Sequence, residues 1–172
     1  MNSPPPATAP ILVMGVGNLL LGDDGVGVVL ARRLTSRPLP AGVEVLDGGT
    51  MGLSLLAHLE GRKAVVVLDA GRGQEALGTL SWQRANSLGL RPPTGGLSPH
   101  EGTAIELLQA ASLVGLLPEE SWVGVVQVRE VETRHGLSPH LEQRLPHLLA
   151  EVEAFLAQLV ARLLPPASPS SL

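Results

Sequence analysis

Short hydrophobic runs alternate along this chain with longer segments in which hydrophobic residues recur every three or four positions. The short runs are rich in Val and Leu and are bounded by Gly, Pro or charged residues, a pattern typical of strands buried on both faces. They predict strands at Ile11–Val16, Val43–Leu46, Ala64–Leu68, Thr79–Gln83 and Trp122–Val128. The longer segments predict helices near Gly25–Leu34, Met51–Leu59, Gly102–Leu116 and Ser138–Leu164.

The C-terminal segment has the clearest helical pattern. Its hydrophobic residues recur in steps of three or four along one face: Leu141, Leu145, Leu148, Val152, Leu156, Leu159 and Leu163. Ser138 and Pro139 predict an N-cap followed by a proline in the first helical position, and Pro146 predicts a kink or a break into two helices. We expect the hydrophobic face of this segment to lie on the sheet.

The alternation of strands and helices predicts an α/β protein of three layers with a parallel or mostly parallel sheet. Residues 11–164 should form a single domain, because 172 residues with 44% hydrophobic content are enough for one core. Residues 1–10 and 165–172 are rich in Pro and polar residues, and we expect both to be disordered tails.

Composition excludes several classes of function. The chain has no cysteine, so it has no disulfide, thiolate ligand or iron–sulfur cluster. Its formal charge of −4 and its 2% aromatic content offer little to bind phosphates or stack on bases, so a nucleic-acid partner is not expected. The first residues lack an export signal, and no hydrophobic run approaches the ~20 residues of a spanning helix. These features predict a soluble cytoplasmic protein without a membrane partner.

Three residues that can bind a metal follow predicted strands or precede a predicted helix. Asp24 comes after the first strand, Asp69 follows the third, and His100 precedes the helix near Gly102. Two carboxylates and one imidazole suit a metal of borderline softness, and a nearby helix N-terminus favours the neutral, metal-binding form of His100. Each residue also has a simpler interpretation, with Asp23 as a helix cap beside Asp24, Asp69 as a turn residue and His100 as an exposed loop residue.

A second glycine-rich turn follows the second predicted strand. Asp47, Gly48, Gly49 and Thr50 are explained either by a strand end with Thr50 capping the next helix, or by a loop whose bare backbone lets another polypeptide approach. In the second interpretation Asp47 lines the same crevice as the metal-binding candidates. Asn18, in the first glycine turn, is a further candidate for contact with a substrate.

The first glycine turn also resembles the start of a dinucleotide-binding fold, but Leu20 stands where that fingerprint has its third glycine. Asp23 and Asp24 would oppose a pyrophosphate, each at about 3 kcal/mol for a like-charge contact at ~5 Å and an effective dielectric near 20. A nucleotide-binding module is therefore the less favoured alternative.

Four motifs occur in order along the chain: G-V-G-N-L-L-L-G-D-D-G-V-G at 15–27, L-D-G-G-T-M-G at 46–52, V-V-L-D-A at 66–70 and S-P-H at 98–100. Together they resemble the hydrogenase maturation protease family, the endopeptidases that trim the C-terminus of the NiFe-hydrogenase large subunit. The resemblance covers roughly residues 11–160, nearly all of the predicted domain. Many family members carry Glu where this chain has Asp24.

The resemblance implies a three-layer α/β/α sandwich with a twisted, mostly parallel five-stranded mixed sheet. It implies a peptide-bond hydrolase whose catalytic and metal-binding residues are Asp24, Asp69 and His100, with Asn18, Asp47, Gly48, Gly49 and Thr50 contacting the substrate. The metal is nickel already inserted in the large-subunit precursor, so the isolated protein needs no metal of its own. We expect a cytoplasmic monomer whose partner is that precursor.

The same residues also suit a chaperone that binds an immature metalloprotein without cleaving it. This alternative differs from the protease only in turnover. The sequence does not identify the hydrogenase isoform, the cleavage site or the general base.

Overall fold

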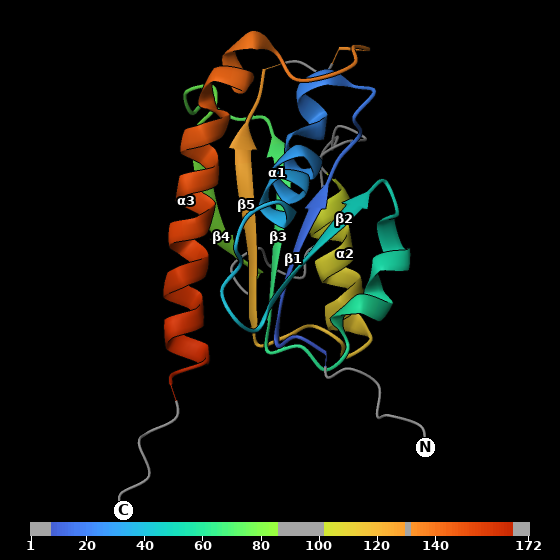
Figure 1. Ribbon diagram of the computed structural model, residues 1–172. Helices are drawn as coiled ribbons and strands as arrows, with labels where there is room; N and C mark the ends of the chain where they lie inside the picture. The colour runs from blue at the N-terminus through green and yellow to red at the C-terminus, as the bar shows by residue number, and fades with distance from the viewer. Residues whose placement is uncertain (1–7, 86–101, 130–131, 167–172) are drawn as a thin grey trace, which may run out of the picture.

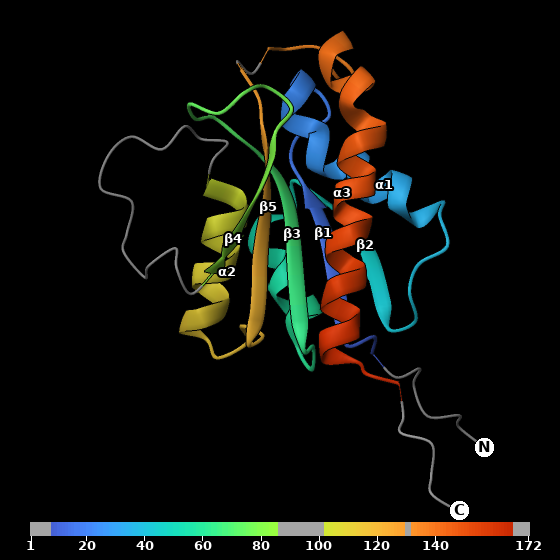
Figure 2. The same cartoon turned by 90° about the vertical axis from the view of Figure 1, so that its left-hand side faces the viewer.

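The computed structural model describes residues 8–85, 102–129 and 132–166. A central sheet lies between two helical layers (Figures 1 and 2). Helices α1 (Val26–Thr35) and α3 (Pro139–Leu163) cover one face, while the 3-10 helix η2 (Gly52–Leu59) and α2 (Gly102–Leu113) cover the other. The predicted three-layer α/β architecture is confirmed.

The sheet has five strands in the order β2-β1-β3-β5-β4. They are β1 (Ile11–Val16), β2 (Val43–Gly49), β3 (Ala64–Gly71), β4 (Leu80–Arg84) and β5 (Glu120–Gln127). β1 pairs in parallel with β2 and β3, and β3 pairs in parallel with β5. Only the edge strand β4 runs antiparallel, on β5, so the sheet is mixed and mostly parallel, as predicted.

The central strands are hydrophobic on both faces because both faces are covered. Along β1, Ile11 and Val13 join the core under α1 and α3, whereas Leu12, Met14 and Val16 join the core under η2 and α2. All of these side chains are buried. The continuous hydrophobic runs of the sequence therefore reflect burial from two sides.

The structure corrects several predicted boundaries. β2 continues to Gly49 and β3 to Gly71, so Asp69 lies inside a strand and does not begin a turn. The segment expected as a helix near Met51 is the 3-10 helix η2. A short 3-10 helix η1 (Gly22–Gly25) also precedes α1, so the chain turns more tightly there than the pattern indicated.

Helix α3 is one continuous helix, so the predicted alternative of two helices broken at Pro146 is wrong. Pro146 lies on the exposed face, where water can bind the carbonyl group that the missing N–H leaves free. The predicted start is confirmed, because the N-cap Ser138 hydroxyl accepts a hydrogen bond of 3.4 Å from Leu141 N–H and Pro139 opens the helix.

Two residues of the predicted N-terminal tail are hydrogen-bonded to the rest of the domain. The carbonyl oxygens of Ala9 and Pro10 accept hydrogen bonds from Arg62 and from the backbone N–H groups of Lys63 and Ala64, so these two residues belong to the folded domain. Residues 1–7 and 167–172 lie outside the described part of the chain. Within the described ranges, the helices are too short or too polar to cross a membrane.

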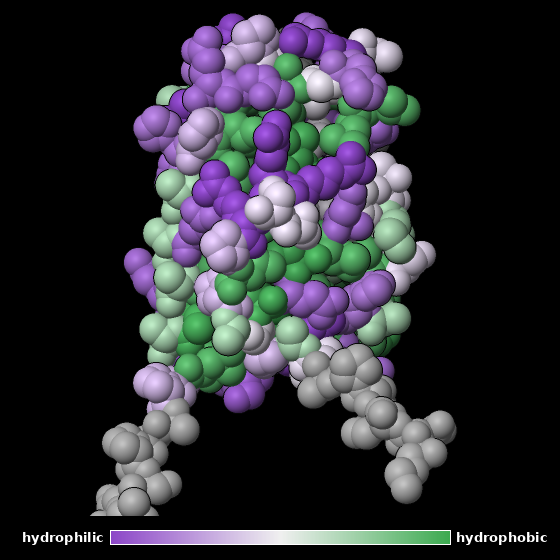
Figure 3. Space-filling model, viewed as in Figure 1, coloured by the Kyte–Doolittle hydropathy of each residue, from purple (hydrophilic) through white to green (hydrophobic). Residues whose placement is uncertain are grey.

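The face of the molecule that carries α1 and α3 mixes hydrophilic and hydrophobic side chains (Figure 3). Arg37, after α1, and Glu153, on α3, form an ion pair of 2.9 Å across it. Both partners are largely exposed, so this pair contributes little compared with the buried hydrophobic residues between the helices. Packing therefore holds α1 and α3 together.

Two glycines allow α1 to lie unusually close to the sheet. A methyl group on Gly27, in the first turn of α1, would overlap the carbonyl oxygens of Leu68 on β3 and Val16 on β1. A methyl group on Gly15 would in turn overlap the carbonyl oxygen of Gly27. The helix thus begins in direct contact with the ends of both central strands.

We predict that Gly27→Ala lowers the free energy of unfolding by about 3 kcal/mol, because backbone atoms of two strands would have to move. Gly61→Ala is the matched control: Gly61 has a φ of +73° and no heavy atom near the added methyl group, so its cost of about 1–2 kcal/mol is conformational. Urea unfolding followed by circular dichroism measures both. Equal losses would contradict the close approach.

Candidate functional site

The candidate site lies where the connections from neighbouring strands diverge. Strand β1 lies between β2 and β3 in the sheet. The connection that follows β1 leads to β2 on one side, and the next connection leads to β3 on the other side. In open α/β sheets the crevice outside the carboxyl ends of two such strands is the usual ligand site. Asp24 follows β1 and Asp69 lies near the end of β3, so this topology brings them to the same crevice.

Asp69 lies on a part of β3 that extends past its neighbour. β1 pairs with β3 only as far as Leu68, whereas β5 pairs with β3 up to Gly71. Asp69 shares the face of Val65 and Val67, which is the face covered by α2, and it is only 4% exposed. Its carboxylate accepts a hydrogen bond of 2.8 Å from Ala70 N–H and another from the backbone of Ala104, in the first turn of α2.

Asp24 lies in η1 and is equally buried, at 4% exposed. Its Oδ2 accepts a hydrogen bond of 2.8 Å from Asn18 N–H, so the glycine turn holds the carboxylate directly. Gly17 has a φ of +130°, and a methyl group there would overlap the carbonyl oxygen of Asp24. Glycine is required at this position by both backbone conformation and space.

The pKa of the Asp69 carboxyl group is shifted by its surroundings. The pKa of Asp69 is raised from 3.8 to about 8, first because burial disfavours its charged form and further because the negative charge of Asp24 is close. The two backbone N–H groups oppose this shift without cancelling it. Near neutral pH the site therefore holds a proton on Asp69, and a cation that replaced this proton would relieve the repulsion within the pair.

Asp23 has a different role from the predicted helix cap. Neither η1 nor α1 has a side-chain cap, so the prediction of Asp23 as the capping residue is wrong. Instead, Asp23 Oδ1 accepts a hydrogen bond of 2.6 Å from the backbone N–H of Ser138, at the start of α3. Two adjacent acids thus point to different places, one to the candidate site and one to the C-terminal helix.

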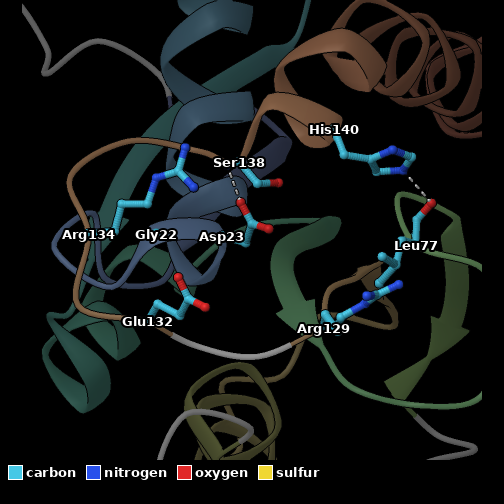
Figure 4. Close-up of a pocket in the computed structure, with 8 residues that line it drawn as sticks. All are labelled: Gly22, Asp23, Leu77, Arg129, Glu132, Arg134, Ser138 and His140. Carbon is cyan, nitrogen blue, oxygen red and sulfur yellow. Dashed lines mark hydrogen bonds between the residues drawn. The ribbon is translucent and has the colours of Figure 1, made fainter.

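A polar cavity of about 430 Å³ opens beside Asp23 (Figure 4). Arg129 and Arg134 lie on opposite sides of Asp23, Glu132 lies below it, and His140 contacts the Leu77 carbonyl oxygen at 3.1 Å. Arg134 also donates to the carbonyl oxygen of Leu137. Charges of both signs therefore line this cavity, and the sequence motifs did not point to it.

The second glycine loop lies at the end of β2. Asp47 forms an ion pair of 2.7 Å with Arg32 of α1, so its carboxylate faces α1 and lies on the opposite face of the sheet from Asp69. Gly48 and Gly49 end β2, and the Met51 N–H donates to the Gly48 carbonyl oxygen to close a turn. The prediction that Thr50 caps the next helix is wrong, because η2 has Met51 at its N-cap and no side-chain cap.

The third predicted metal-binding residue, His100, lies outside the described residues. Within residues 8–85, 102–129 and 132–166, no three His, Cys, Asp or Glu residues are grouped as a metal site would require. The structure thus brings Asp24 and Asp69 together. The position of His100 relative to them stays a prediction.

The backbone donors of the site could not be predicted from residue type. The N–H groups of Asn18 and Ala104 hold the two carboxylates, yet neither residue type indicates such a role. The only available signal was position: Asn18 directly follows the first glycine turn, and Ala104 lies in the first turn of a predicted helix, where backbone N–H groups are free.

Comparison with known proteins indicates the same family as the four sequence motifs. The family model for hydrogenase maturation protease matches residues 28–155. The hydrogenase 2 maturation protease of Escherichia coli is 35% identical over 153 residues, covering 86% of this chain and 91% of that protein. The hydrogenase expression/formation protein HoxM of Azotobacter vinelandii is 35% identical over 155 residues, covering 88% and 74%.

Among solved structures, the hydrogenase maturating endopeptidase HybD from E. coli superposes with a TM-score of 0.73 at 34% identity. The match covers 87% of this chain and 93% of that structure. The shared fold therefore includes the sheet and both helical layers.

We predict that Asp69→Asn stabilises the protein increasingly as the pH rises. The raised pKa of Asp69 means that its protonation stabilises the folded state, fully below pH 3.8, and that this contribution is lost as the pH rises through about 8. An amide does not ionise, so the variant should gain on the order of a few kcal/mol over wild type between pH 5 and 8.5. Thermal unfolding across this range, with a chelator present, measures the difference. A constant difference would contradict the raised pKa.

Proposed function

This chain belongs to the hydrogenase maturation protease family and is a peptide-bond hydrolase, and we propose that it removes the C-terminal extension of a NiFe-hydrogenase large-subunit precursor. In this proposal the enzyme recognises the precursor through the nickel ion that the precursor already carries. The observation that supports it best is the buried pair formed by Asp24, in η1 after β1, and Asp69, near the end of β3.

The pair has the properties that a divalent cation requires. Both carboxyl groups offer oxygen atoms as ligands, and both are buried. Burial lowers the effective dielectric and so strengthens the attraction between a carboxylate and a cation of the substrate. Burial and the charge of Asp24 raise the pKa of Asp69, so nickel would displace a proton on arrival and its positive charge would compensate the second carboxylate. An acidic pair without a cation is thus less stable than the same pair with one.

Each residue then has a defined role. Asn18 N–H orients Asp24, while Ala70 and Ala104 N–H groups orient Asp69, so the carboxylates are held in place before the substrate binds. His100 supplies the nitrogen ligand expected from the sequence. The precursor's nickel would bring the scissile bond next to the pair, where a metal-polarised water or carbonyl group can react.

The loops around the site suit a protein substrate. Leu20 follows β1, and Met51 and Leu53 follow β2, and all three side chains are about half exposed or more. These three residues are therefore candidates for contact with the precursor. Asn18 directly follows the glycine turn after β1, and Gly48, Gly49 and Thr50 lie at the end of β2 or just after it, which supports the proposal that they contact the precursor. Asp47 instead pairs with Arg32 on the opposite face of the sheet from Asp69.

We predict that the purified protein shortens a nickel-loaded large-subunit precursor and leaves the nickel-free precursor intact. Asp24→Asn, Asp69→Asn and His100→Ala should each lower the cleavage rate by at least about 100-fold, because each removes a ligand to the nickel of the substrate. Intact-mass measurement of the precursor over time detects loss of the C-terminal peptide. Arg129→Ala, whose side chain lies in the polar cavity, serves as a surface-charge comparison.

Three outcomes would reject parts of this proposal. Equal cleavage of both precursors would exclude nickel as the recognition mark. Normal cleavage by the Asp24 and Asp69 variants would exclude the acidic pair from the site. A stable complex with the nickel-loaded precursor and no peptide release would show that the protein acts as a chaperone.

A further inference from the structure

A second, smaller cavity lies directly beside Asp69. Its volume is about 170 Å³, and its walls come from β3, β4, β5 and the first turn of α2. It is lined by Asp69, Ala70, Gly71, Arg72, Gln83, Ala104, Ile105, Val123 and Val125. None of these residues lines the polar cavity beside Asp23.

The apolar part of this cavity arises from local packing. Val123 and Val125 project from β5 toward α2, and Ile105 closes the opposite wall from the helix. Gly71 leaves room for the Val125 side chain, because a methyl group on Gly71 would overlap Val125 Cγ1. Two residues after Asp69, the lack of a side chain at Gly71 thus lets Val125 form part of the hydrophobic wall.

The size of the cavity fits one hydrophobic side chain. A cavity of about 150 Å³ lined by aliphatic residues holds a benzene molecule, so about 170 Å³ accommodates a side chain of the size of Leu, Ile or Met. Arg72 and Gln83 add polar atoms at the wall, but a charged side chain would still lose most of its hydration against Val123, Val125 and Ile105. The cavity thus selects for a hydrophobic group of limited size.

We propose that this cavity binds the hydrophobic side chain of a residue directly next to the scissile bond of the precursor, and that Ile105 and Val125 determine which side chain fits. Asp69 belongs both to the acidic pair and to the wall of this cavity. Consecutive Cα atoms are only about 3.8 Å apart, so a peptide whose carbonyl group meets the acidic pair has a neighbouring side chain within reach of the cavity. The inference rests on the proposed function of the acidic pair.

The experiment uses nickel-loaded precursors in which the residue on each side of the scissile bond is replaced in turn by Ala, Leu, Phe or Asp. The enzymes are wild type, Ile105→Ala, Ile105→Trp and Leu113→Trp. Leu113 is 81% exposed at the other end of α2, so its substitution adds an indole to the same helix away from the cavity. The measurement is kcat/KM for each precursor, together with a thermal melt of each enzyme.

At one of the two positions, wild type should cleave the Leu precursor at least about tenfold better than the Ala precursor, and the Asp precursor least well. Ile105→Trp should reverse the order of Leu and Ala by narrowing the cavity. Ile105→Ala should improve cleavage of the Phe precursor relative to Leu, and Leu113→Trp should keep the wild-type order.

The outcomes separate this inference from the proposed function. If wild type cleaves no nickel-loaded precursor, the proposed function fails and the inference fails with it. If wild type cleaves all precursors equally, or if both Ile105 variants keep the wild-type order, only the inference is overturned. Should the Trp variant melt below the assay temperature, the Ala variant alone decides.

Discussion

The burial of two neighbouring carboxyl groups is the constraint on which this structure is built. Asp24 and Asp69 are close enough for the charge of one to raise the pKa of the other, and both are almost completely buried. Such a pair is unfavourable unless the surrounding fold is stable enough to hold it. The fold meets this requirement with backbone N–H donors to each carboxylate and with a closely packed contact between α1 and the ends of β1 and β3.

The glycines of the first turn connect the fold to the site. Gly27 and Gly15 let α1 touch the two central strands, and Gly17 lets the backbone pass close to the Asp24 carbonyl oxygen. These are the same strands that deliver the two acids, so the packing that stabilises the sheet also sets the spacing of the carboxylates. A larger residue at any of these positions would push backbone atoms of the strands or of η1 and α1 apart. In a closely packed interior such a shift would also move the segments that carry Asp24 and Asp69.

The boundaries of the strands could be predicted from the sequence where hydrophobic side chains determine them. They were predicted less well where backbone hydrogen bonds determine them. β1 was predicted with its observed boundaries because its hydrophobic run and its two-sided burial coincide. β3 was predicted to end at Leu68, where the hydrophobic run stops, yet its pairing with β5 continues to Gly71 because backbone hydrogen bonds do not depend on side-chain type. Asp23 and Asp24 look equivalent in the sequence, and only the contact of Asp23 with Ser138, far along the chain, separates their roles. The Ala104 N–H beside Asp69 leaves no mark on the sequence at all.

The raised pKa of Asp69 gives the proposed recognition of nickel a physical basis. Without a cation, a proton on Asp69 is the least costly way to keep the pair buried, and the site then carries one negative charge. In the proposed recognition, a nickel ion brought by a precursor would exchange for that proton and bind both carboxylates, whereas a precursor without nickel would offer nothing to compensate the second charge. Discrimination between the two precursors would then follow from electrostatics within the pair, without any contact to the rest of the precursor. In this proposal the acidic pair recognises nickel, and the loops and cavities around the pair determine which peptide bond of the precursor is cleaved. These are two separate properties of the site.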